Sequence, residues 1–147
     1  MKSEKPSRIK IIYVIDDLGL GGAQRQLTEL LRTMAKDAFE IAVIALSKEK
    51  LDYLANLNAA SIPVTLIAHQ GKWSWGTLWK LYRKIKNSKP DIVCTWLFTA
   101  DLYGRLAAFF SGVPLIISAM RNTIDDMPWH YRLASRILSL VTSCVTI

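Results

Sequence analysis

Long apolar runs and cysteines are scarce in this sequence of 147 residues. No apolar stretch approaches the ~20 residues that cross a bilayer, and the polar, basic start before Ile9 has no signal-peptide core. We therefore expect a cytoplasmic location. Cys94 and Cys144 lie in apolar segments that are typical of buried strands, where a thiol packs as a small hydrophobic side chain. No metal site is predicted from them or from the other residues.

Acidic residues are missing from a long central segment. The chain has 19 basic and 12 acidic residues, a formal net charge of +7, yet residues 53–90 contain no Asp or Glu. The second half of this segment combines lysines and arginine with tryptophans. A basic and aromatic surface is typical of contact with anionic lipid headgroups, and nucleic acid is the competing partner. The residues expected to contact a membrane are Trp73, Trp75, Trp79, Lys80, Arg83 and Lys84.

Two familiar phosphate-binding signatures are also absent. Gly19, Gly21 and Gly22 lack the spacing of the dinucleotide fingerprint, because Gln24 stands at its sixth position, and no Gly-Lys-Ser/Thr sequence occurs. The glycines nevertheless join an apolar strand to an amphipathic helix. Free N–H groups at such a helix start attract phosphate, and glycines let it approach the backbone. The alternative is a tight strand-to-helix corner that requires glycine for its own geometry.

A regular alternation of strands and helices runs along the chain. Apolar runs at 9–15, 39–46, 64–68, 91–95, 115–118 and 142–147 predict strands, and helical spacing predicts helices within 23–34, 51–57, 75–87, 102–110 and 129–140. Strands that are apolar on both faces and separated by helices indicate a doubly wound parallel sheet. We expect residues 9–147 to form a single Rossmann-like domain with three α/β/α layers, and residues 1–8 to be a flexible basic N-terminus.

Ligands of such sheets bind beyond the carboxyl ends of the strands. Polar residues follow the predicted fourth and fifth strands at this edge, where they could hold an acceptor hydroxyl or a lipid phosphate. An i,i+4 ion pair with Arg105 is the alternative for Asp101, and aspartates at 125 and 126 are equally suited to capping a helix. The residues expected to bind an acceptor are Trp96, Thr99, Asp101, Arg121 and Asn122.

Several segments resemble the N-terminal half of family-four glycosyltransferases of the GT-B class. The matching segments are 13–25 with the leucines behind it, 89–93, 96–108, and 112–118 followed by Arg121 and Asn122. They cover essentially the whole chain, in the order of the family. The sequence departs from the family at Gln24, where Glu is usual, and at Thr99, near which a histidine is often found. The resemblance implies the first half of a GT-B fold, without the C-terminal half that holds the donor.

The resemblance also implies a function. Family members transfer a sugar from a nucleotide diphosphate donor with retention of configuration, and they need no metal or other cofactor. Gly21, Gly22 and Arg25 would face the donor diphosphate across an interdomain cleft, although a solvated helix face is the alternative for Arg25. Thr99 and Arg121 are the candidates for a catalytic contribution, and no catalytic residue is otherwise assigned.

We therefore expect the acceptor-side domain of a glycosyltransferase, inactive by itself, whose acceptor is a saccharide or is linked to lipid at the inner face of the membrane. Cell-surface polysaccharide synthesis is the expected context. An inactive α/β module that binds a nucleotide or sugar is the second candidate. A nucleic-acid-binding protein is the third, and it is disfavoured because it leaves the glycine-rich loop unexplained.

Overall fold

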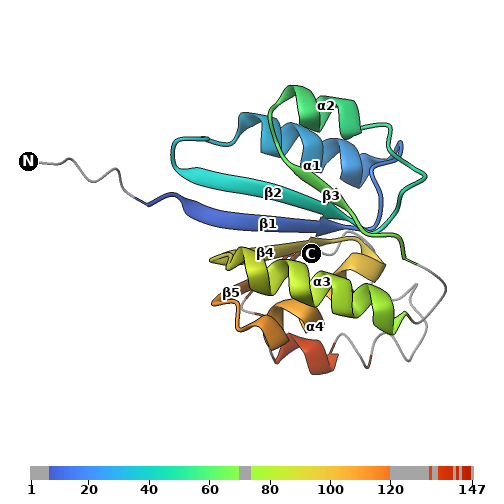
Figure 1. Ribbon diagram of the computed structural model, residues 1–147, viewed down its shortest axis with the longest axis vertical. Coiled ribbons are helices and arrows are strands. Elements are labelled where there is room, and N and C mark those ends of the chain that lie inside the picture. The colour runs from blue at the N-terminus through green and yellow to red at the C-terminus, as the bar shows by residue number, and fades with distance from the viewer. Residues whose placement is uncertain are drawn as a thin grey trace, which may run out of the picture.

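The computed structural model describes residues 7–69, 74–119, 133, 136–140, 142 and 144–146. Within them, six parallel strands form one sheet in the order β3-β2-β1-β4-β5-β6 (Figure 1). The strands are β1 (Ile9–Ile15), β2 (Phe39–Ala45), β3 (Val64–Leu66), β4 (Ile92–Trp96), β5 (Leu115–Ala119) and β6 (Cys144–Thr146). The helices are α1 (Gly22–Thr33), α2 (Leu54–Ala59), α3 (Trp75–Ser88) and α4 (Phe98–Ser111).

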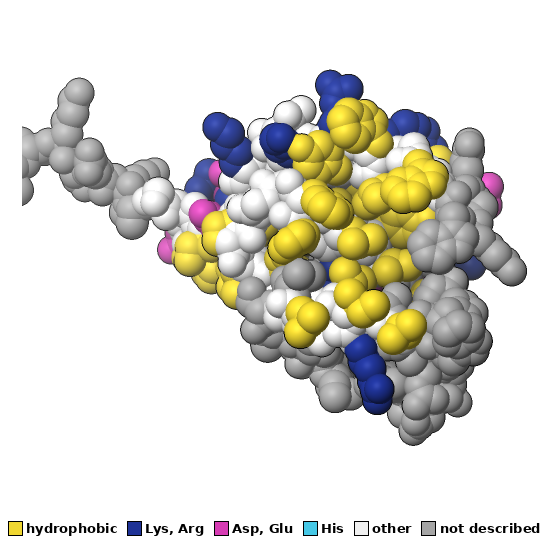
Figure 2. Space-filling view, turned by 90° about the horizontal axis from the view of Figure 1, so that it is seen from below, with side chains coloured by type: hydrophobic (Ala, Val, Ile, Leu, Met, Phe, Trp, Pro, Cys, Tyr) yellow, Lys and Arg dark blue, Asp and Glu magenta, His cyan; other side chains and the backbone are white. Residues whose placement is uncertain are grey.

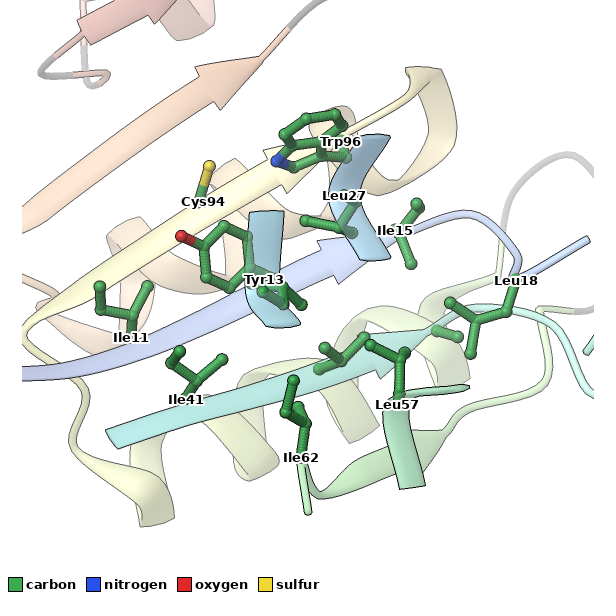
Figure 3. Close-up of a cluster of buried hydrophobic side chains, with 13 residues drawn as sticks. Ile11, Tyr13, Ile15, Leu18, Leu27, Ile41, Leu57, Ile62, Cys94 and Trp96 are labelled. Atoms are coloured by element: carbon green, nitrogen blue, oxygen red, sulfur yellow. The ribbon is translucent and has the colours of Figure 1, made fainter. Parts of the chain in front are cut away.

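Helices cover both faces of the sheet, as the apolar strands predict. Figure 1 shows α1 and α2 on one face and α3 and α4 on the other. Along the central strand β1, Ile11, Tyr13 and Ile15 enter the core beneath α1 and α2, whereas Ile12 and Val14 enter the core beneath α3 and α4. Figure 3 shows the first of these cores. The predicted doubly wound, three-layer Rossmann-like fold is therefore confirmed.

Among the helix starts, that of α4 differs most from its predicted position, because the helix begins at Phe98 rather than near residue 102. The extra turn contains Thr99 and Ala100, whose backbone N–H groups both donate to the carboxylate of Asp16 at the end of β1. A cap supplied from 83 residues away in the sequence leaves no local signal. The helix start therefore escapes an analysis of helical spacing.

Glycine at position 104 lets α4 lie close to the sheet. A Cβ atom on Gly104 would lie 2.5 Å from the Thr95 Cγ2 atom and 3.5 Å from the Val14 Cβ atom. A methyl group cannot fit at the first distance without moving the helix or the strand. Glycine at position 104 thus allows the short distance between α4 and the strands β1 and β4. This close contact lies one turn after the helix start that Asp16 caps.

The two ends of the chain fall largely outside the described residues. At the N-terminus, the Arg8 Nη1 atom donates to the Lys36 carbonyl oxygen at 3.3 Å. Near the C-terminus, residue 133 and residues 136–139 are helical, within the range predicted for the last helix. The division into a basic N-terminus and one following domain stays a prediction.

Candidate functional site

The strand order places a topological switch point between β1 and β4. These two strands are hydrogen-bonded neighbours, but the helix after β1 covers one face of the sheet and the helix after β4 covers the other (Figure 1). In doubly wound sheets this is where ligands bind. The residues that follow β1 and β4 therefore make up the candidate site.

The N-terminus of α4 is already occupied by a side chain of the protein. Thr99 N–H donates to Asp16 Oδ2 at 3.2 Å, and Ala100 N–H donates to Asp16 Oδ1. Burial raises the pKa of Asp16 to about 6, although the hydrogen bonds from Ala100 and Thr99 favour the carboxylate and oppose this rise. The carboxylate takes the place that an anionic ligand would otherwise fill at this helix start.

The N-terminus of α1 has no such cap. Gly21 at its N-cap lies in extended backbone, no side chain accepts from the first-turn N–H groups, and the first turn has no acidic residue. A Cβ atom on the exposed Gly22 would meet nothing within 4 Å, so the chain itself does not require glycine there. Helix α3, in contrast, is capped by the Ser74 hydroxyl, which accepts from Thr77 N–H at 3.2 Å. Of the three described helices longer than eight residues, α1 is therefore the one whose first turn has no side-chain cap, which leaves its N–H groups free for an anion.

The loop before α1 is held in shape by Asp17. Its Oδ1 atom accepts from the Gly19 backbone N–H and from the Gln24 Nε2 atom, both at 2.9 Å. A Cβ atom on Gly21 would lie 2.2 Å from Gln24 Oε1, so the amide of Gln24 lies directly over Gly21. A glutamate at position 24 could not donate to Asp17 and would place two negative charges together. This contact explains physically why glutamine suits position 24 of this sequence.

Two cations lie next to this loop. Arg25 is exposed in the first turn of α1, where the sequence predicts it. Lys50, which the sequence analysis missed, is brought beside Gly19 because Leu18 N–H donates to the Lys50 carbonyl oxygen at 2.9 Å. The sequence feature that could have indicated Lys50 is its position shortly after the second strand, because the carboxyl ends of parallel strands lie at the same edge of the sheet. A bound anion at α1 would thus have positive side chains within its surroundings.

Leu97 has an unusual backbone at the switch point. It links β4 to α4 with φ 67° and ψ 173°, a region that residues other than glycine rarely adopt. Backbone strain of this kind collects at functional sites, held in place by the surrounding structure. Here the Asp16 cap on the next turn holds it. A leucine gives no sign of this conformation in the sequence.

Trp96 does not reach the edge of the sheet. Its side chain is 5% exposed and packs within the core beneath α1, near Tyr13 and Leu27 (Figure 3). The expectation that Trp96 binds an acceptor is therefore replaced by a packing role. The tryptophan is the last residue of β4 and packs at the end of this core that lies nearest the start of α4.

Asp101 is likewise enclosed within the domain. Its Oδ1 atom accepts from the hydroxyls of Thr95 and Ser118, and its Oδ2 atom lies 2.6 Å from Arg105 Nη2. The i,i+4 ion pair that the spacing predicts is thus present, but it is buried rather than solvated, with 1% of the Arg105 side chain exposed. Arg105 Nη1 also donates to the Thr142 hydroxyl at 3.1 Å. We assign Asp101 a structural role in place of acceptor binding, because both of its oxygens already have partners inside the protein.

Of the other three residues expected to bind an acceptor, the structure describes only Thr99. Thr99 is half-buried at the switch point, where its N–H donates to the Asp16 carboxylate. Arg121 and Asn122 lie outside the described residues. In the part of the chain that the structure describes, no three His, Cys, Asp or Glu side chains gather as metal ligands would.

The basic and aromatic side chains of α3 lie at the surface. Trp75 and Trp79 are 82% and 60% exposed. Lys80, Arg83 and Lys84 are exposed as well, whereas Trp73 lies outside the described residues. None of the described helices is long and apolar enough to cross a membrane. Contact of α3 with a membrane stays a prediction at this point.

Comparison with known proteins finds the same fold in several solved structures. The chain is similar to MurG of Acinetobacter baumannii, with a TM-score of 0.68 and 17% identity over 93% of this chain and 40% of that one. It is also similar to Anabaena Alr3699/HepE in complex with UDP and glucose, with a TM-score of 0.73 and 18% identity over 94% of this chain and 37% of that one. A UDP-N-acetylglucosamine 2-epimerase gives a TM-score of 0.64 and 18% identity over 95% of this chain and 41% of that one.

These likenesses establish the fold, and the chain spans only about two fifths of the length of each of these proteins. No curated protein matches the sequence. The model of the family described as Glycosyltransferase Family 4 matches residues 20–138, which is most of the chain and includes α1, α3 and α4. The chain therefore belongs to glycosyltransferase family 4.

Proposed function

We propose that this domain is one wall of the active site of a retaining glycosyltransferase. The donor is a nucleotide diphosphate sugar, which a second domain outside these 147 residues would hold. The free N–H groups at Gly21 and Gly22 face the donor diphosphate, and Arg25 and Lys50 add positive charge. Stabilising the leaving diphosphate is the main task in such a transfer, and fixed backbone donors perform it without rearranging. No cofactor is needed in this scheme.

The observation that carries this proposal is the difference between the helix starts. The protein itself caps α3 with Ser74 and α4 with Asp16, but it leaves α1 uncapped beside an exposed glycine. An uncapped start costs stability unless a ligand or water satisfies its N–H groups. At the switch point of a family 4 domain, the diphosphate of the donor is the ligand with the right charge.

The acceptor is proposed to be a saccharide or lipid-linked molecule at the inner face of the membrane, in the synthesis of cell-surface polysaccharide. Thr99 offers a half-buried hydroxyl at the switch point, and Arg121 and Asn122, which lie outside the described residues, come shortly after β5 in the sequence. An acceptor bound there would approach the donor from the side of β4 and β5. Its sugar, its linkage and its lipid are open to assay with membrane extract.

Binding of nucleotide diphosphates to the chain tests the proposed donor contact. We expect UDP, GDP or ADP at about millimolar concentration to shift the backbone amide resonances of Gly21 and Gly22, because one domain supplies only part of the site. Gly22→Val should abolish these shifts by placing a branched side chain where the phosphate approaches. Gly76→Val is the matched control, since Gly76 is an exposed glycine in the first turn of the capped helix α3.

The outcomes separate the proposal from its rival. Shifts that are the same in both variants, or absent with every nucleotide, would remove the support for a diphosphate site at α1. The second candidate, a module that binds a nucleotide without transfer, shares the α1 contact. It predicts binding by the chain but no sugar transfer, with any donor, by a protein that joins this domain to the proposed second domain.

A further inference from the structure

Helices α3 and α4 form an exposed apolar surface with a groove between them. The groove encloses about 360 Å³ and is lined by six residues, which we call the α3–α4 face: Trp75, Leu78, Trp79, Tyr82, Ala107 and Phe110. A smaller hollow of about 70 Å³ continues it, since Trp75 and Leu78 line both. Figure 2 looks onto the side of α3 and α4 and shows hydrophobic side chains gathered there, with Lys and Arg side chains at the margin.

The aromatic side chains of this face are strongly exposed. Trp75, Trp79 and Phe110 keep 82%, 60% and 65% of their surfaces in solvent, and the neighbouring Phe109 keeps 50%. Two helices contribute them, so the face is a contiguous surface and not one stray side chain. Soluble domains seldom expose aromatic groups in this way unless another surface covers them.

The charge beside the face has one sign. Lys86 Nζ donates to the Tyr82 hydroxyl oxygen at 2.6 Å and lies 5.1 Å from the centre of the Tyr82 ring. Arg83 follows Trp79 by four residues and therefore lies next to it on the helix surface. Helix α3 contains no acidic residue, and the one acidic residue of α4, Asp101, is buried in its pair with Arg105.

The exposed aromatic side chains and the positive charge together indicate what kind of partner covers the α3–α4 face. A second copy of the chain would bring two positive margins together, which opposes a symmetric dimer. Nucleic acid would satisfy the lysines but not an apolar groove. An anionic bilayer offers both partners at once, because aromatic groups settle at the interface while cations lie over the lipid phosphates. We infer that the α3–α4 face docks on an anionic bilayer, with Trp79 and Phe110 in the interface.

Docking through the α3–α4 face would bring the candidate site close to the membrane. The significance of this position rests on the proposed function. Helices α3 and α4 both begin at the edge where the parallel strands end, so Trp75 and Thr99 lie at the same edge as the glycine-rich loop. Ser74 N–H donates to the Tyr103 hydroxyl at 2.8 Å and links the start of α3 to the second turn of α4. A lipid-linked acceptor held in the bilayer would then meet the domain beside the switch point.

Flotation of the chain with vesicles tests the docking surface. We expect the chain to bind phosphatidylcholine vesicles that contain about 30% phosphatidylserine, and to bind pure phosphatidylcholine at least about tenfold more weakly. Arg83→Glu with Lys86→Glu should weaken binding to the anionic vesicles about tenfold or more. The matched control is Lys36→Glu with Lys48→Glu, which makes the same charge change at exposed positions away from α3 and α4.

The apolar part of the surface has its own control. Trp79→Ala with Phe110→Ala should weaken binding about tenfold, whereas Leu30→Ala, which trims a partly exposed side chain on α1, should not. Brominated lipids provide a second readout, since they should quench the tryptophan fluorescence of the wild type more than that of Trp79→Phe. Thermal melting of each variant identifies any that do not fold.

Four results would overturn the inference. They are equal binding to both kinds of vesicle, equal losses in the face and control variants, a dimer that the face variants dissociate, and oligonucleotide binding at physiological salt that competes with vesicles. The vesicle assay contains no nucleotide sugar, so it fails or succeeds independently of the donor site. Nucleotide shifts at Gly22 should persist in Arg83→Glu with Lys86→Glu, which keeps the two proposals apart.

Discussion

Asp16 should make the stability of the domain depend on pH. Its carboxylate caps α4 from the end of β1, and burial raises its pKa from 3.8 to about 6. Because the folded protein then holds the proton more tightly than the unfolded chain, the stability that Asp16 contributes is full below pH 3.8 and is lost as the pH rises through 6. This difference in pKa corresponds to about 3 kcal/mol, of which about 2.5 kcal/mol falls between about pH 4 and about pH 8.

Two variants measure this effect. Asp16→Asn and Asp16→Ala both remove the titrating group, and urea unfolding at a series of pH values gives the free energy of unfolding of each. The wild type should lose about 2.5 kcal/mol relative to either variant as the pH rises from about 4 to about 8. Asp16→Asn keeps one acceptor for the N–H groups of α4, so Asp16→Ala should be less stable by about 1 kcal/mol throughout.

The slope of the difference decides the outcome. A difference between wild type and variants that does not change with pH, or that changes in the opposite direction, would refute the reasoning about burial. A slope seen with Asp16→Asn but not with Asp16→Ala would assign the effect to the new amide and not to the lost charge.

Three further substitutions test the packing around the site by urea unfolding. Gly104→Ala should destabilise the domain by about 1–3 kcal/mol because its methyl group has no room. Gly22→Ala should be neutral or stabilising by up to about 1 kcal/mol, since a methyl group there meets no other atom. Equal effects of the two substitutions would contradict the close approach of α4 to the sheet. Gln24→Glu should lower the free energy of unfolding by about 1 kcal/mol or more at neutral pH, since it loses the hydrogen bond to Asp17 and adds charge repulsion. A loss no greater than that of Gln24→Ala would argue against repulsion. Leu97→Gly should be more stable than Leu97→Ala by about 1 kcal/mol, the reverse of the usual order, if the backbone there is strained.

The fold could be predicted from the sequence because its signals are local and repeated. Each strand is apolar on both faces, and α3 shows its buried side at the helical spacing of Thr77, Leu81 and Ile85. The exposure of Trp79 and of the lysines follows from the same spacing. A parallel sheet covered on both faces is then the arrangement that buries all of these side chains.

The candidate site could be predicted only in part, because several of its contacts join residues distant in the sequence. The spacing of Asp101 and Arg105 correctly indicates an ion pair but cannot show that Thr95 and Ser118 enclose it. Nor does the sequence distinguish Trp96 at the edge from Trp96 in the core, since β4 is covered on both sides. The role of Asp16 depends on the neighbouring positions of β1 and β4, which only the strand order supplies.

Gly22 separates what selection for stability favours from what selection for activity favours. The fold leaves open space where its side chain would be, so alanine is the better residue for the helix alone. A library of variants screened only for thermal stability or expression should therefore drift toward alanine at this position. The same library, screened for sugar transfer in a protein that joins this domain to the proposed second domain, should return to glycine. The divergence between the two outcomes would identify the site without knowledge of the donor.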